Sequence, residues 1–92
     1  MLKYQCDQEG FSLMEQRNGD DFEFTIVIKD IDRYLPAIKQ VREHFDRDSI
    51  YTDVLFYVHP NNEYRIIVRH DFYIDFILSL FKYRFVNSVN WN

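Results

Sequence analysis

The sequence predicts an α+β fold in which an antiparallel sheet of about five strands carries two helices packed on one face. Three observations support this class: two stretches of alternating apolar and polar residues around turn sequences, an amphipathic segment between them, and a strongly apolar segment after the second. The expected order is β-β-α-β-β-α-β, with a possible extra strand at the N-terminus. The 92 residues contain no Pro/Gly/Ser-rich boundary, which predicts a single domain, 1–92.

Residues 2–6 alternate apolar and polar side chains and predict the extra first strand. Residues 11–17 and 22–29 alternate as two further strands on either side of Asn18-Gly19, the strongest short hairpin signal in the chain. A two-residue turn at Asn18-Gly19 sets Leu13 opposite Phe24. That register places the apolar residues of both strands on one face.

The segment from Asp30 to Phe45 is predicted to be an amphipathic helix, because apolar residues recur at helical spacing with charged residues opposite. Pro36 limits where this helix begins, since a proline deep in a helix removes a hydrogen bond and clashes with the preceding turn. We therefore expect either Asp32 as the N-cap or an irregular turn over 30–34 before the helix.

A second hairpin is predicted over 54–69, with a three-residue loop at 60–62. This loop sets Val58 opposite Tyr64 on the apolar face and Asp53 opposite Arg69 on the exposed face. A last strand is expected near 85–91, where apolar and polar residues again alternate.

The segment 72–83 is predicted to be a second helix capped by Asp71, and it is apolar around most of its circumference. Its polar residues, Asp75, Ser79 and Lys82, recur at i, i+4 and i+7 and are expected to form one narrow stripe. Such a helix must be buried on more than one side.

Composition narrows the function classes. The net charge is −4, and residues 1–53 hold twelve acidic and seven basic side chains, which argues against nucleic acid as the partner. No apolar run is long enough for a membrane span, and neither a signal peptide nor a cysteine pair for an internal disulfide is present, so a cytoplasmic protein is expected. The Gly-rich and Cys-pair motifs of cofactor and metal sites are missing, so we expect no cofactor.

Three weak constellations could carry chemistry. The first could hold an anionic ligand or support acid–base chemistry, with arginine as the donor to the ligand and a carboxylate beside an imidazole. Cross-strand pairing and a helix cap explain the same residues, which are His59, Arg65, Arg69, His70 and Asp71. His44, Asp46 and Asp48 lie within five residues, but this spacing favours a solvated helix end, so no metal site is expected. Cys6 has no base partner in the sequence and is expected to be a small buried apolar residue.

The second helix supplies the preferred hypothesis. A row of apolar side chains at i, i+4, i+8 and i+11 is expected to project past the core into a homodimer or partner interface; it consists of Phe72, Phe76, Leu80 and Tyr83. We therefore predict a non-catalytic protein-interaction module, such as an acidic regulator, inhibitor or immunity-type binder. The alternative is a small enzyme or anionic-ligand-binding domain that uses the His, Arg and Asp residues named above.

Overall fold

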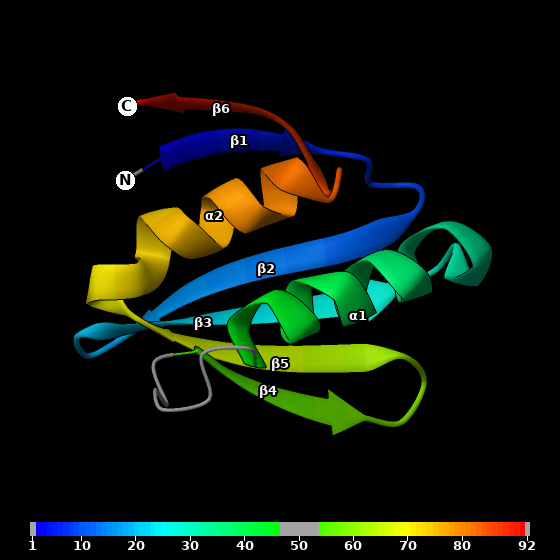
Figure 1. Ribbon diagram of the computed structural model, residues 1–92, viewed down its shortest axis with the longest axis horizontal. Helices are drawn as coiled ribbons and strands as arrows, with labels where there is room; N and C mark the ends of the chain where they lie inside the picture. Colours follow the sequence, from blue (N-terminus) through cyan, green and yellow to red (C-terminus); the bar gives the residue numbers. More distant parts are fainter. Residues whose placement is uncertain (1, 47–53, 92) are drawn as a thin grey trace.

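The computed structural model describes residues 2–46 and 54–91, and the helices lie on one face of an antiparallel sheet (Figure 1). In chain order the elements are β1 (Leu2–Cys6), β2 (Phe11–Asn18), β3 (Asp21–Ile28), α1 (Ile31–Asp46), β4 (Val54–His59), β5 (Glu63–Arg69), a 3₁₀ turn (His70–Phe72), α2 (Tyr73–Lys82) and β6 (Val86–Trp91).

The strands form two antiparallel sheets rather than one. Four of them pair in the order β2-β3-β5-β4, so the two hairpins meet through β3 and β5. The extra N-terminal strand is present as β1, and it pairs with β6 in a separate two-stranded ribbon. The predicted α+β class is therefore confirmed, with the strands at the two ends of the chain divided from the main sheet.

The turn of the first hairpin lies one residue later than predicted, which shifts the pairing of its strands by two residues. Asn18 pairs with Asp21, so the turn residues are Gly19 and Asp20, and Leu13 lies opposite Ile26 rather than Phe24. Gly19 has a φ of 63°, which suits a turn whose first central position needs the left-handed region. A shift by two leaves every side chain on its predicted face, because the side-chain period of a strand is two.

The second hairpin has the predicted register. Val58 pairs with Tyr64 and His59 with Glu63 across a loop in which Asn61 and Asn62 both have positive φ. Asparagine tolerates this conformation better than most residues, which explains why two of them close the loop. The predicted partner of Arg69, Asp53, lies outside the described residues.

The first helix begins earlier than predicted because Asp30, rather than Asp32, caps it. The Asp30 carboxylate accepts a hydrogen bond from the Arg33 backbone N–H at 3.3 Å, and its carbonyl accepts one from the Tyr34 N–H at 3.0 Å. Asp32 lies in the first turn, where an acidic residue is favoured by the helix dipole. Pro36 is accommodated inside the helix.

The second helix differs from its prediction at both ends. Asp71 makes no capping bond, and its carboxylate lies 2.9 Å from His70 Nε2 instead. At the other end Arg84 has a φ of 68°, and the N–H groups of Arg84 and Phe85 donate to the carbonyls of Phe81 and Leu80. This pair of bonds is a Schellman motif, which stops the helix and turns the chain into β6.

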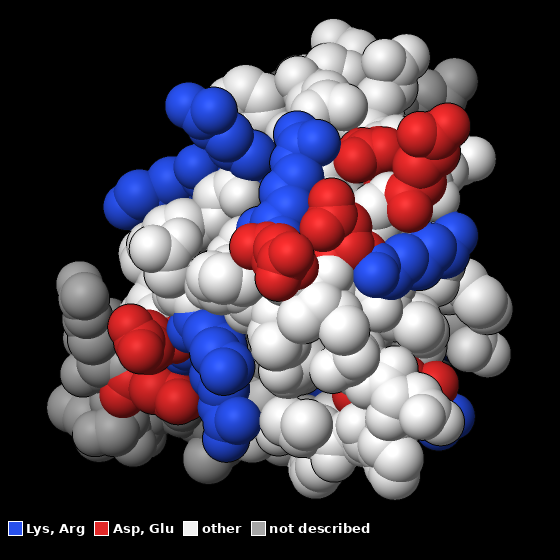
Figure 2. Space-filling model, turned by 90° about the vertical axis from the view of Figure 1, so that its right-hand side faces the viewer, with Lys and Arg blue, Asp and Glu red and all other residues white. Residues whose placement is uncertain are grey.

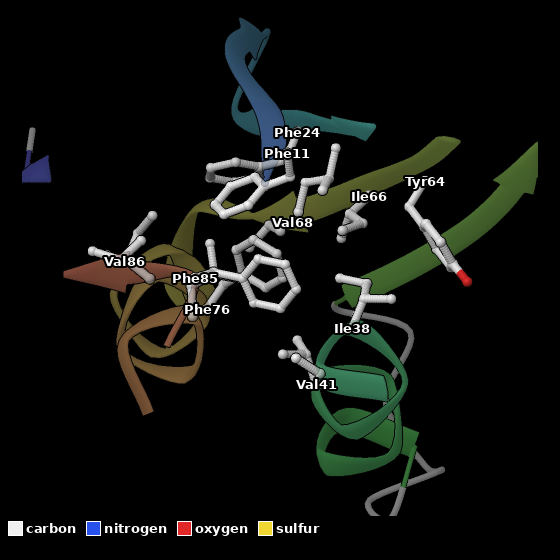
Figure 3. Close-up of a cluster of buried hydrophobic side chains, with 14 of the residues drawn as sticks. Phe11, Phe24, Ile38, Val41, Tyr64, Ile66, Val68, Phe76, Phe85 and Val86 are labelled. Carbon is white, nitrogen blue, oxygen red and sulfur yellow. The ribbon is translucent and has the colours of Figure 1, made fainter. Parts of the chain in front are cut away.

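The core lies between the four-stranded sheet and the helices (Figure 3). The sheet contributes its inner face, which is the face toward the helices, and the rings of Phe24 and Phe76 lie 4.7 Å apart where β3 meets α2. The largest fully buried side chains come from strands and helices alike: Tyr34, Phe11, Phe24, Phe76, Phe85, Ile26, Ile38, Ile66, Ile77, Leu80, Val41 and Val68.

A glycine joins the β1–β2 turn to the start of α1. The carbonyl of Gly10 accepts hydrogen bonds from the N–H groups of Lys29 and Asp30, and the Tyr34 ring lies directly against the Gly10 backbone. The Tyr34 hydroxyl also donates to Asp7 at 2.9 Å, which lowers the pKa of that carboxyl. Any side chain at position 10 would overlap this ring.

We expect Gly10→Ala to lower the free energy of unfolding by about 1–3 kcal/mol, because the added methyl displaces a buried tyrosine. Urea denaturation followed by circular dichroism measures the change. Gly19→Ala is the comparison, since no neighbouring atom lies within 4 Å of a Cβ there and only its backbone conformation opposes a side chain. A Gly10→Ala protein as stable as the parent would show that the ring is not held against this backbone.

Candidate functional site

The candidate site is the side of α2 that points away from the sheet. Three large apolar residues are exposed there at helical spacing: Ile74 at 43%, Leu78 at 49% and Phe81 at 48%. Asp75 and Lys82 are exposed beside them. These five residues are called the exposed face of α2 below.

The row predicted to form an interface does not lie on this face. Phe76 and Leu80 are fully buried in the core, and Phe72 and Tyr83 are half-buried against it. Ser79, expected in one narrow polar stripe with Asp75 and Lys82, is also buried and donates a hydrogen bond to the Phe76 carbonyl at 2.6 Å. The helix is apolar nearly all round, so periodicity alone could not tell its buried side from its exposed side.

Hollows lie on both sides of this face. One of about 320 Å³ lies between the helices and is lined by His44, Phe45, Phe72, Asp75, Leu78, Ser79 and Lys82. The other, of about 470 Å³, lies at the end of α2 and is lined by Arg33, Phe81, Lys82, Arg84, Val86 and Asn87. Leu78 and Phe81 therefore border concave surface rather than standing singly on a convex one, which is typical of a binding surface.

Charge is ordered along α2. Asp71 and Asp75 lie exposed at its beginning, and Lys82 and Arg84 lie exposed at and just beyond its end. The face that carries the beginning of α1 differs, because Lys and Arg side chains are interspersed there with Asp and Glu (Figure 2). The separation of sign along α2 is therefore not repeated on that face.

The residues predicted to bind an anion do not converge. His59 ends β4 and Arg69 ends β5, and the pairing of His59 with Glu63 puts about six residues, or roughly 20 Å of strand, between them. Arg65 lies on the outer face of the sheet and pairs with Glu63 of its own strand at 3.2 Å. Three hollows lined by described residues contain none of the five predicted side chains.

Asp48 lies outside the described residues, so the weak metal constellation at the end of α1 is not tested there. His44 instead has ring contacts with Phe45 at 5.0 Å and with Tyr83 at 6.4 Å. It lies beside the hollow between the helices.

A polar cluster that the sequence did not reveal lies where β1, β2 and α2 meet. The Glu15 carboxylate accepts hydrogen bonds from the hydroxyls of Tyr4 at 2.6 Å and Tyr73 at 3.0 Å. These residues are 11 and 58 positions from Glu15 in the chain, so no local motif could have linked them. Burial and this hydrogen bond raise the pKa of Tyr4 well above its ordinary value.

Cys6 lies in a hollow of about 450 Å³ between β1 and β2, beside Tyr4 and Leu13. Burial raises the pKa of its thiol, which disfavours the thiolate that a nucleophile needs. Cys6 was expected to be buried; it is half-buried and packs against the edge of the core.

No helix in the described ranges, 2–46 and 54–91, is long and apolar enough to cross a membrane. No protein-family model, curated protein or solved structure matches this chain. The chemistry of the described side chains is therefore the basis for assigning a function.

The tyrosine–glutamate cluster predicts a loss of stability at alkaline pH. Because the pKa of Tyr4 is higher in the folded protein than in the unfolded chain, its contribution is complete below about pH 10 and declines as the pH rises further. Tyr34, with a pKa raised by burial and by Asp7, acts in the same direction. Urea denaturation between about pH 8 and pH 11 should show the decline.

Tyr4→Phe should reduce this pH dependence and cost about 1 kcal/mol at neutral pH, where one hydrogen bond to the carboxylate is lost. Tyr57→Phe is the control, because Tyr57 is exposed on the outer face of the sheet. If the free energies of unfolding of both variants matched that of the parent at every pH, Tyr4 would not be a donor to Glu15.

Proposed function

We propose that this chain is a non-catalytic protein-interaction module that binds through the exposed face of α2. The observation that supports the proposal is the row of Ile74, Leu78 and Phe81, each almost half exposed, on a helix whose other side holds the core together. Exposed apolar side chains beside hollows and rimmed by charge are what protein interfaces present before binding. Regulators, inhibitors and immunity-type binders are the kinds of protein that work in this way.

The division of α2 into two sides supports binding by this helix. Tyr73, Phe76, Ile77, Ser79 and Leu80 face inward and are buried. The three outward apolar residues are not among the buried core residues and expose apolar surface to water, where burial would be favourable by about 25 cal/mol per Å². A partner that covers them gains this free energy without any rearrangement of the fold.

The enzymatic alternative has less support. Its five residues lie along the outer face of the sheet and at the 3₁₀ turn, on surface that the three described hollows do not include. Catalysis needs a reacting group held within hydrogen-bond reach of its partners in a concave site. His70 and Asp71 are within such reach of each other, at 2.9 Å, but both are exposed.

We expect Leu78→Glu to abolish partner binding while changing the free energy of unfolding by less than about 0.5 kcal/mol, because a surface charge there leaves the core intact. Affinity capture from cell extract with the parent protein and with the variant, compared by quantitative mass spectrometry, checks the loss. Thermal unfolding checks that the variant is folded.

Met14→Glu is the matched control. Met14 is 65% exposed but lies on the outer face of the sheet, so the same substitution there should leave binding unchanged. A partner lost equally from both variants, or retained by both, would contradict binding through α2.

A further inference from the structure

We propose that the exposed face of α2 is occupied by the α2 helix of a second copy of this chain, antiparallel and related by a two-fold axis at Leu78. This inference rests on the proposed function, because it names the partner of that same surface. A closed two-fold interface requires one patch that is complementary to itself. The exposed face of α2 meets this requirement at each of its five positions.

The apolar positions are symmetric about Leu78. At 3.6 residues per turn, Ile74 and Phe81 project to one side of Leu78 and Asp75 and Lys82 to the other. In an antiparallel pair the two-fold axis places the Ile74 and Phe81 sides of the two helices together, and likewise their Asp75 and Lys82 sides. The axis also reverses the direction of the second helix. Leu78 therefore meets its own copy, and Ile74 meets the partner subunit's Phe81.

The charged positions obey the same symmetry. Asp75 lies three residues before Leu78 and Lys82 four after it, so each Asp75 meets the partner subunit's Lys82, twice in the dimer. A parallel pair would set acid against acid and base against base, so charge selects the antiparallel arrangement.

The surroundings of α2 leave room for this arrangement. The helix lies between the β1–β6 ribbon and α1 on the side of the sheet that faces the viewer in Figure 1. Its exposed face points away from the sheet, since Phe76, Ile77 and Leu80 on the opposite side are buried. Two copies therefore meet through their helix layers, with the sheets on the outside.

A simpler explanation covers only the charges. The helix dipole favours acids in the first turn and bases in the last, whether or not a partner is present. It does not explain three exposed apolar residues between them, and it makes a different prediction. Exchanging the two charges opposes the dipole at both ends, whereas in the antiparallel dimer the exchange restores every cross-helix pair.

The test is sedimentation equilibrium of the parent, D75K, K82D and the double variant D75K/K82D. A single pair of short helices is at the small end of stable interfaces, so concentrations from about 1 µM to about 1 mM are needed. We expect the parent to form a dimer. The dissociation constant of the dimer should be at least about tenfold higher in each single variant, and in the double variant it should lie within about threefold of the parent's value. Thermal unfolding at the lowest concentration verifies that each variant is folded.

Each other outcome overturns the second copy as the partner. A parent protein that stays monomeric at every concentration overturns it. The proposed function then depends on a separate result, the capture of a different protein that the Leu78→Glu variant fails to bind. A double variant whose dimer dissociates more readily than that of either single variant shows that Asp75 and Lys82 do not pair across the two helices, and it overturns the antiparallel pair. If the dimer persists in D75K, in K82D and in Leu78→Glu, it forms through another surface. That result contradicts both the antiparallel pair and binding through α2.

Discussion

Coverage of the inner face of the four-stranded sheet by α2 is the interaction on which the rest of the structure depends. The Phe76 ring lies against Phe24 of β3 and within 6.4 Å of Phe56 of β4, so one helical side chain reaches both hairpins. Phe45 of α1 lies 5.9 Å from the same ring. Removing this ring would loosen the packing of both helices on the sheet, because aromatic rings supply a large share of the buried area in a domain of this size.

The position of α2 also determines where the chain ends meet. The Schellman motif after the helix sends Phe85 and Val86 into the core and directs β6 back alongside β1. Tyr73, on the buried side of α2, donates to Glu15 of β2, which also accepts a hydrogen bond from Tyr4 of β1. The two-stranded ribbon is therefore attached to the main sheet through the helix and through one shared carboxylate, without backbone pairing between β1 and β2.

Local patterns predicted the elements and the faces of the strands, but not the buried side of the second helix or the ends of the helices. Both hairpins and both helices follow from alternation, turn residues and helical spacing, and the first hairpin kept its faces despite a two-residue error in register. The directions of Phe76 and Leu78 could not be predicted, because each belongs to a row with the same helical spacing. Only the packing of the sheet against one row decides which is buried, and that is a long-range property.

The same limit applies to the candidate site. Asp71 and Asp75 at the beginning of α2 and Lys82 and Arg84 at its end are visible in the sequence, yet the pattern has an obvious local explanation in capping and the dipole. The pattern indicates pairing of charges across two helices only once the exposed apolar row is known to lie between those charges. The predicted cluster at His59, Arg69 and His70 does not converge. His59 and Arg69 lie at opposite ends of the paired strands β4 and β5, so the length of the strands separates them.

Oxidative cross-linking tests the central claim most directly, because a disulfide forms only where two Cα atoms lie within about 7 Å. With Cys6→Ser removing the native thiol, Leu78→Cys lies on the proposed axis and should cross-link two copies rapidly. Ile74→Cys should not, because an antiparallel pair separates the two copies of position 74 by about 12 Å along the helix axis. Equal cross-linking at positions 74 and 78, or none at position 78, would contradict an interface centred on Leu78.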